Sequence, residues 1–163
     1  MAGLVRIECF MADRHRQAVY RAEDQWSALV DRGGTVDFFG STLQAPVQLR
    51  FGRLKEVTDY VEHACSERGI TAPTVRHRKG GTRAHYSDGV IAIPSHEPWA
   101  MRESVVLHEV AHHVCVIGTG STQHDEHFTC AMLSLVRMRL GHEAELLLRT
   151  GYTACGAPLL ETA

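Results

Sequence analysis

The sequence contains no apolar run that approaches the ~20 residues needed to cross a membrane. Residues 1–10 carry Arg6 and Glu8, where a secretory signal peptide needs an uninterrupted apolar core. An excess of one charge is also missing, since 17 Lys and Arg stand against 19 Asp and Glu and the formal net charge is -2. We therefore expect a cytoplasmic protein with no membrane association. We also expect no general attraction for nucleic acid, although a local basic patch is compatible with this balance.

Paired cysteines are absent as well. The five cysteines are odd in number and scattered, with no C-x-x-C pair among Cys9, Cys65, Cys115, Cys130 and Cys155. This pattern predicts reduced thiols in the core, with Cys115 as a possible metal ligand. A length of 163 residues with 44% hydrophobic residues fits one globular domain, residues 1–163.

One segment is both apolar and chemically specific. Residues 105–116 are apolar and uncharged except for an H-E-x-x-H motif, His108-Glu109-x-x-His112, and the adjacent His113. On a helix, residues four apart share a face, so His108 and His112 can bind one metal ion. Glu109 lies about 100° further round the helix, where its carboxylate can take a proton from a water at the ion. The alternative is a core helix whose histidines are simply hydrogen bonded.

The rest of the chain reads as alternating helices and strands. Helical periodicity predicts helices from Asp13 to Gly33, over 54–69, and over 122–140 with Thr122 and Asp125 as a capping pair. The helix that carries the H-E-x-x-H motif, which we call the active-site helix, should start near Trp99 or Met101 and stop at Gly118. A last helix should include 143–149. Strand-forming residues predict strands over 35–40, 46–51 and 74–79, and Asp88-Gly89 predicts a hairpin within 83–94. His85 and His96, on the hairpin and the loop after it, are weaker candidates for the metal site.

A catalytic zinc site usually has three protein ligands and one open position, so a third ligand should follow Gly118. On the helix predicted there, His127 lies about 60° from the inward face and Glu126 about 200° from it. His124 heads that face, followed at helical spacing by Phe128, Ala131, Leu135 and Met138. We expect His124 to be the third ligand, with His127 as the alternative.

These residues resemble a known family. The motif Val105-Val106-x-His108-Glu109-Val110-Ala111-His112 resembles that of zincin metallopeptidases, whose short members carry a third ligand on the following helix. The run from His124 to Phe128 is similar to the H-G-x-x-F/W signature of SprT-like zinc proteases, and also to small actinobacterial metallohydrolases with this two-helix core. The resemblance covers roughly residues 86–140. The sequence departs from the pattern at Asp125, where glycine is usual, and at His113, where the family is apolar. It also lacks the cysteine cluster of the DNA-linked members.

The expected fold is α+β and zincin-like, with a small twisted sheet packed on the H-E-x-x-H helix and a helical C-terminal part. The expected function is zinc-dependent hydrolysis, with His108, His112 and His124 as zinc ligands and Glu109 as the base. The donor that stabilises the transition state is left open among His127, Tyr86 and Tyr152. Alternatives are a metal-stabilised regulatory or interaction module, and a hydrolase of small molecules.

A peptide or protein substrate is favoured over a small molecule. The strand over 89–93 leads into the active-site helix, and everything after Pro94 reads as helix or loop. We therefore expect that strand to keep a free edge, to which an extended peptide could add as a further strand.

Overall fold

The computed structural model describes residues 12–160. The expectations for a signal peptide and for Cys9 fall outside these residues. The helices are α1 (Arg16–Arg32), α2 (Leu54–Glu67), α3 (Glu103–Thr119), α4 (Glu126–Leu140) and α5 (His142–Cys155), with a 3-10 turn, η1 (Pro98–Met101), before α3. The strands are β1 (Gly34–Phe38), β2 (Ser41–Ala45), β3 (Thr74–His77), β4 (His85–Ser87) and β5 (Val90–Ile93). The α+β class is confirmed.

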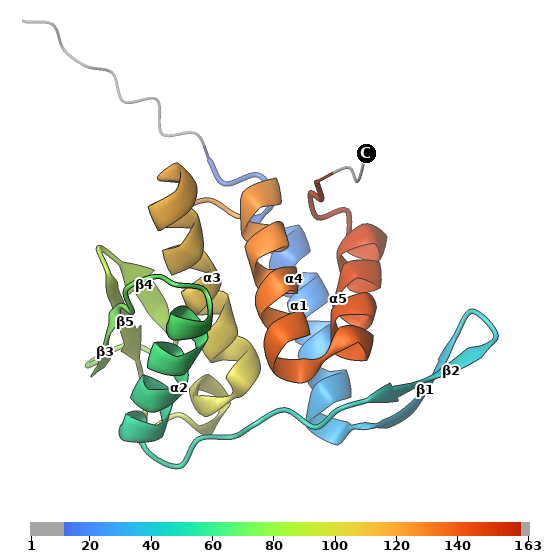
Figure 1. The fold of residues 1–163 in the computed structure, drawn as a ribbon, viewed down its shortest axis with the longest axis horizontal. Coiled ribbons are helices and arrows are strands. Elements are labelled where there is room, and N and C mark those ends of the chain that lie inside the picture. Colours follow the sequence, from blue (N-terminus) through green and yellow to red (C-terminus); the bar gives the residue numbers. More distant parts are fainter. Residues whose placement is uncertain (1–11, 161–163) are drawn as a thin grey trace, which may run out of the picture.

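Four helices form one half of the fold. Figure 1 shows α1, α3, α4 and α5 packed along one another, with α2 and the β3–β5 sheet on the other side of α3. The largest fully buried side chains come from both halves and include Trp26, Tyr152, Phe128, Ile91, Ile93 and Leu107. Because α3 lies between the helices and the sheet, its residues are enclosed on two sides.

The sheet beside α3 has the strand order β3-β5-β4. Strand β5 pairs in parallel with β3 and antiparallel with β4. The expected free edge on β5 is therefore wrong, because β3, which precedes it by more than ten residues, occupies one side of it. The outer strands are β3 and β4.

The predicted strand over 46–51 is also wrong. Strand β2 ends at Ala45, and β1 and β2 form a separate two-stranded ribbon that projects from the body in Figure 1. Pro46 has no N–H to continue a ladder, which is one reason the pairing stops there. Gly33 before β1 has φ 65°, and a Cβ there would lie 2.5 Å from Val47 Cγ2, so this entry requires glycine.

Residues 46–51 instead fasten the start of α3. The backbones of Leu49 and Glu103 bond to each other, and Glu103 Oε2 also accepts from Leu49 N at 2.8 Å. The buried Gln48 accepts from Ser104 N at 2.8 Å and donates to Ser27 and Asp31 of α1. This segment therefore ties α1 to the first turn of α3.

Several helix ends differ from the expectation. Helix α1 begins at Arg16 and not at Asp13, and α4 begins at Glu126 with Asp125 as its N-cap and not at Thr122. Helix α3 follows η1 and continues past Gly118 to Thr119, where Gly120 at φ 74° ends it. Two of these shifts concern residues described below, because Asp13 and His124 lie before α1 and α4 and not within them.

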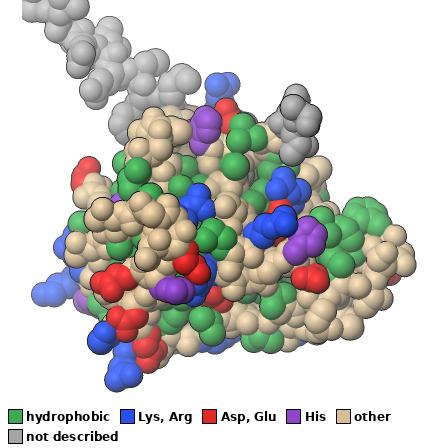
Figure 2. All heavy atoms as spheres, in the orientation of Figure 1, with side chains coloured by type: hydrophobic (Ala, Val, Ile, Leu, Met, Phe, Trp, Pro, Cys, Tyr) green, Lys and Arg blue, Asp and Glu red, His purple; other side chains and the backbone are tan. Residues whose placement is uncertain are grey.

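The surface and the thiols complete the description. Cys65 and Cys115 are buried free thiols as expected, but Cys130 is exposed and so is no core residue. Figure 2 shows charges of both signs interspersed over the α2 side, where Lys55 pairs with Asp59 at 2.8 Å. Within residues 12–160, no helix combines the length and the apolar character needed to span a membrane.

We expect Gln48→Leu to destabilise the protein by about 1–3 kcal/mol, because the buried N–H of Ser104 loses its acceptor. Thermal unfolding should show this as a fall in Tm of about 2–4 °C per kcal/mol for a chain of this size. Gln44→Leu on exposed β2 is the matched control and should stay within about 0.5 kcal/mol of the parent. Equal losses in both variants would contradict the fastening role of Gln48.

Candidate metal centre

Helix α3 places the three motif residues as the sequence predicts. His108 and Glu109 are buried, with 5% and 6% of their surfaces exposed, and His112 is half-buried one turn further along. The rings of His108 and His112 lie 4.9 Å apart between centroids. The α-helical spacing of four residues therefore brings both imidazoles to one side of α3.

His124 joins them from the loop that precedes α4. It is 4% exposed, whereas His127 is exposed on the first turn of α4. His124 was chosen from the sequence as the residue that would head the inward face of a helix, and this reason is wrong, because His124 precedes α4. The Asp125 carboxylate caps the helix by accepting from His127 N and Phe128 N. The chain before this cap then directs His124 toward α3.

The three histidines form one cluster. Their ligand atoms all lie within 4.8 Å of one another, and no fourth His, Cys, Asp or Glu of residues 12–160 joins this group. The Nε2 atoms of His108 and His124 are 3.2 Å apart. Phe128 packs against all three rings at centroid distances of 4.6–4.8 Å. The cluster thus has an apolar wall on the α4 side.

Two carboxylates bond to the Nδ1 atoms of His108 and His124. His108 Nδ1 lies 2.6 Å from Glu23 Oε2, and His124 Nδ1 lies 2.5 Å from Asp13 Oδ2. The other oxygen of Glu23 accepts from Tyr152 Oη at 2.6 Å. An ionised carboxylate only accepts, so each Nδ1 carries the hydrogen and each Nε2 is left as the ligand atom.

The spacing of the two Nε2 atoms is suited to binding a cation between the rings. With a hydrogen on each Nδ1, His108 Nε2 and His124 Nε2 face each other across 3.2 Å, where they can share a proton or bind one metal ion in its place. Nitrogens at about 2.1 Å from a tetrahedral zinc would be about 3.4 Å apart, which is close to this spacing. The donor set and its spacing therefore fit a metal ion with three protein ligands.

Burial and charge set the protonation of the cluster. Burial and the charges of His108 and His124 lower the pKa of His112 to about 2, so His112 stays neutral at neutral pH. Burial and His108 likewise lower the pKa of His124, against the opposing pull of Asp13. Burial also acts to lower the pKa of His108, but the charge and hydrogen bond of Glu23 outweigh it and raise that pKa. A proton held on His108 would have to leave when a metal binds, so acid pH should weaken binding.

Glu109 is buried beside the cluster but does not belong to its group of ligand atoms. Burial, together with the charge of Glu23, raises its pKa, while His108 and the backbone N–H of Tyr86 act in the opposite direction. A carboxylate whose pKa is raised toward neutrality takes up a proton more readily than an ordinary glutamate. Glu109 thus lies beside His108 and is bonded to the backbone of β4.

Tyr20 of α1 was not predicted. Its ring stacks on His108 at 5.2 Å and tilts against His124 at 5.1 Å, and the residue is half-buried. Burial and the charge of Glu109 raise the pKa of the Tyr20 hydroxyl, which therefore stays protonated. Tyr20 therefore covers the rings of His108 and His124 from the α1 side, and its hydroxyl interacts with Arg16.

None of the three transition-state donors considered from the sequence directs a free hydrogen-bonding group at the cluster. Tyr152 is fully buried on Glu23, and His127 is exposed outside the cluster. Tyr86 Oη bonds to His113 Nδ1 at 3.0 Å, and His113 Nε2 donates to the carbonyl of Thr71 at 2.8 Å. His113, the departure from the family pattern, thus joins α3 to β4 and to the loop before β3.

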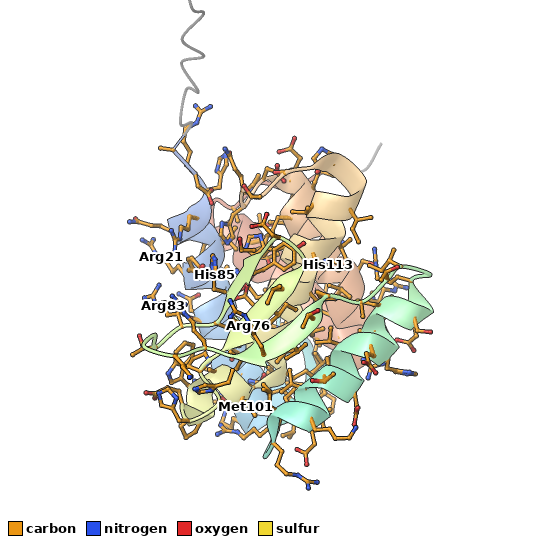
Figure 3. The ribbon with its side chains drawn as sticks, turned by 90° about the vertical axis from the view of Figure 1, so that its left-hand side faces the viewer. Arg21, Arg76, Arg83, His85, Met101 and His113 are labelled. Atoms are coloured by element: carbon orange, nitrogen blue, oxygen red, sulfur yellow. The ribbon has the colours of Figure 1, made fainter. Side chains whose placement is uncertain are left out.

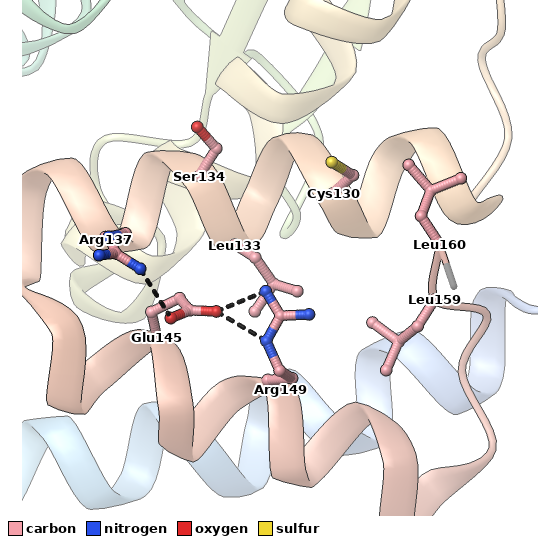
Figure 4. Close-up of a pocket in the computed structure, with 8 residues that line it drawn as sticks. All are labelled: Cys130, Leu133, Ser134, Arg137, Glu145, Arg149, Leu159 and Leu160. Atoms are coloured by element: carbon pink, nitrogen blue, oxygen red, sulfur yellow. Dashed lines mark hydrogen bonds and ion pairs between the residues drawn. The ribbon is translucent and has the colours of Figure 1, made fainter. Parts of the chain in front are cut away.

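His85 and His96 are not part of the cluster. His85 is exposed on β4, within electrostatic reach of His112, and His96 pairs with Glu97 and rests against His77. A pocket of about 260 Å³ lies elsewhere, between α4, α5 and the C-terminal segment (Figure 4). There Glu145 forms an ion pair with both Arg137 and Arg149, so each arginine of this pocket has a carboxylate partner.

No sequence signal pointed to Asp13, Glu23 or Tyr20 as site residues. They lie on α1 or just before it, about a hundred residues from the histidines they contact. Asp13 and Glu23 are ordinary capping and helix residues by pattern alone. Only the packing of α1 against the C-terminal helices brings them to the site.

His124→Ala should weaken metal binding by more than the ~10–100-fold that loss of an outer hydrogen-bond partner costs, because it removes one of three ligand atoms. His127→Ala is the matched control and should bind as the parent does, since His127 is exposed. Calorimetric titration of the metal-free protein with Zn²⁺ and Co²⁺ measures both. A larger loss in His127→Ala would move the third ligand to that residue.

Glu23→Gln should reduce metal affinity by about 10–100-fold. The glutamine has one acceptor oxygen where Glu23 accepts from both Tyr152 and His108, so one donor loses its partner. Asp24→Asn, exposed and adjacent on α1, should leave the affinity unchanged in the same titration. If both variants bind alike, Glu23 does not orient His108.

Comparison of the chain with protein-family models, with curated proteins and with solved structures finds no match. The comparisons therefore show no family for this chain. Its function is inferred from its own residues.

Proposed function

We propose that the protein is a zinc-dependent metallohydrolase of zincin type that cleaves peptide bonds. The observation that carries this proposal is the convergence of His108, His112 and His124 beside the buried Glu109. Two of the three rings are oriented by carboxylates, as in metal sites where an outer acceptor fixes the tautomer.

Zinc suits this donor set. Three neutral imidazole nitrogens with no fourth protein ligand are typical of catalytic zinc, whereas a structural zinc is closed by a fourth side chain. Helix α3 and the loop before α4 provide the ligands from two consecutive elements, as the resemblance to short zincins and SprT-like proteases implies. The two departures from that pattern have other roles, since Asp125 caps α4 and His113 bonds to Tyr86.

In this proposal, different residues bind the zinc ion, accept the proton and stabilise the developing charge. A zinc ion held by the histidines would polarise a carbonyl and make water acidic enough to lose a proton near neutral pH. Glu109 accepts that proton and returns it to the leaving amine. Tyr20, protonated and half-buried at the cluster, can donate to the carbonyl oxygen on which negative charge develops.

The edge strand β4 supports a peptide substrate. It pairs with β5 on one side only, and its residue Tyr86 bonds through the backbone N–H to Glu109. An extended peptide that adds beside β4 would pass close to the base and the histidines. The edge expected on β5 is thus replaced by the edge of β4, which lies nearer to Glu109.

Glu109→Gln should retain one zinc per chain and the parent's thermal stability while losing about 10²–10⁴-fold in turnover, because the amide cannot accept a proton. Elemental analysis and mass-spectrometric cleavage of a diverse peptide library measure the two properties. Glu126→Gln, exposed on α4, is the matched control and should cleave as the parent does.

The same experiment separates the alternatives. Turnover of small esters or amides without peptide cleavage would replace the peptidase by a small-molecule hydrolase. Zinc binding without any turnover would favour a metal-stabilised interaction module. Loss of zinc in Glu109→Gln would contradict the role assigned to Glu109.

A further inference from the structure

A basic hollow lies on the outer face of the β3-β5-β4 sheet. It measures about 470 Å³ and is lined by Arg76, His77, Arg78, Lys79, His85 and Ala92, which we call the basic basin. No carboxylate lines it, although the whole chain has a formal net charge of -2. Figure 3 looks onto this sheet, and its labelled residues Arg76 and His85 come from the two outer strands.

The strand register builds the basin. Ile91 and Ile93 of β5 face the core, so Ala92 between them faces outward. Arg76 of β3 pairs with Ala92 on one side, and His85 of β4 pairs with it on the other. The small side chain of Ala92 lies between the larger basic side chains of Arg76 and His85, and so forms the floor of the hollow.

Arg78 is held in place at one end of the basin. Its guanidinium donates to the carbonyl of Arg83, and its backbone N donates to Ile93 O at 2.8 Å. A Cβ at Gly81 would lie 2.4 Å from Arg78 Nε, so glycine at this position leaves room for the guanidinium where it lies. A guanidinium fixed in this way loses little conformational freedom when it binds a carboxylate.

The cations of the basin are unpaired. Among residues 12–160, no carboxylate oxygen lies within 4 Å of a nitrogen of Arg76, Arg78 or Lys79 in an ion pair. The pocket between α4 and α5 differs, because its two arginines share the carboxylate of Glu145 as an ion-pair partner. The basin therefore offers its charges to an external anion.

The basin also adjoins the histidine cluster. His85 lines the basin from β4, and the next residue on that strand, Tyr86, bonds through its hydroxyl to His113 of α3 at 3.0 Å. Strand β4 lies between the basin and α3, and its backbone bonds to Glu109. A chain bound along β4 would place alternate side chains on the face that carries His85.

We propose that the basic basin binds the carboxylates of aspartate or glutamate side chains in the polypeptide substrate, so that the enzyme prefers acidic segments beside the scissile bond. This inference rests on the proposed peptidase function. The basin is a compact hollow and not an extended basic stripe, and fixed arginines bind carboxylates in a bidentate geometry. Both features favour a peptide over a nucleic acid, whose backbone requires charges spread along a groove.

The test measures binding separately from cleavage. Zinc-loaded Glu109→Gln is titrated, by fluorescence anisotropy, with a labelled peptide rich in Asp and Glu and with its Asn and Gln twin. The acidic peptide should bind at least about tenfold more tightly at low salt, and the difference should shrink as ionic strength rises. Adding Arg76→Gln, alone or with Arg78→Gln, should remove most of this difference. Arg32→Gln, an exposed arginine at the far end of α1, is the matched control and should not change it.

The outcomes are distinguishable. Equal binding of the two peptides, or a preference unaffected by Arg76→Gln, overturns the inference even if the parent protein cleaves both peptides. An acidic preference that depends on Arg76 supports the basin even if no peptide is cleaved, in which case the proposed hydrolase fails alone. Tighter, Arg76-dependent binding of a single-stranded oligonucleotide of equal charge overturns the peptide assignment in favour of nucleic acid.

Discussion

The hydrogen bonds from imidazole to carboxylate at Glu23 and Asp13 are the constraint on which the site depends. Each keeps a hydrogen on Nδ1, so that the Nε2 atoms of His108 and His124 face the same point. Without them, either ring could turn or shift its hydrogen, and the two nitrogens would no longer converge. The bonds are also costly unless they are complete, because Glu23 is buried and would be an uncompensated charge. Tyr152 supplies the remaining donor to Glu23, so a fully buried tyrosine on α5 serves a histidine on α3.

This constraint explains why α1 lies where it does. Helix α1 brings Glu23 and Tyr20 to the cluster, and the residue before its cap region, Asp13, reaches His124. One turn after Glu23, Trp26 also fixes the inward face of α1, since it donates to the carbonyl of Ala144 at 2.9 Å. The H-E-x-x-H helix therefore does not make a metal site by itself. It supplies ligands that the first helix of the chain orients.

The sequence was informative where local periodicity decides the structure. Residues four apart on a helix must share a face, so His108 and His112 could be paired from spacing alone. His124 was chosen for a reason that proved wrong, because Asp125 begins the helix after it and the side chain is placed by Asp13. Asp13, Glu23 and Tyr20 could not be found, since nothing local distinguishes a carboxylate that will meet a histidine a hundred residues away. The edge of the sheet was misplaced for the same reason, as parallel pairing of β3 with β5 is a long-range choice.

Charge is distributed so that the two faces of the sheet have different roles. The inner face is apolar and packs toward α3 through Ile91 and Ile93, which keeps Glu109 buried and its carboxylate poorly solvated. The outer face carries the cations of the basic basin, of which Arg78 acts to lower the pKa of the same carboxylate. Burial is the larger effect, so Glu109 remains a stronger base than an ordinary glutamate.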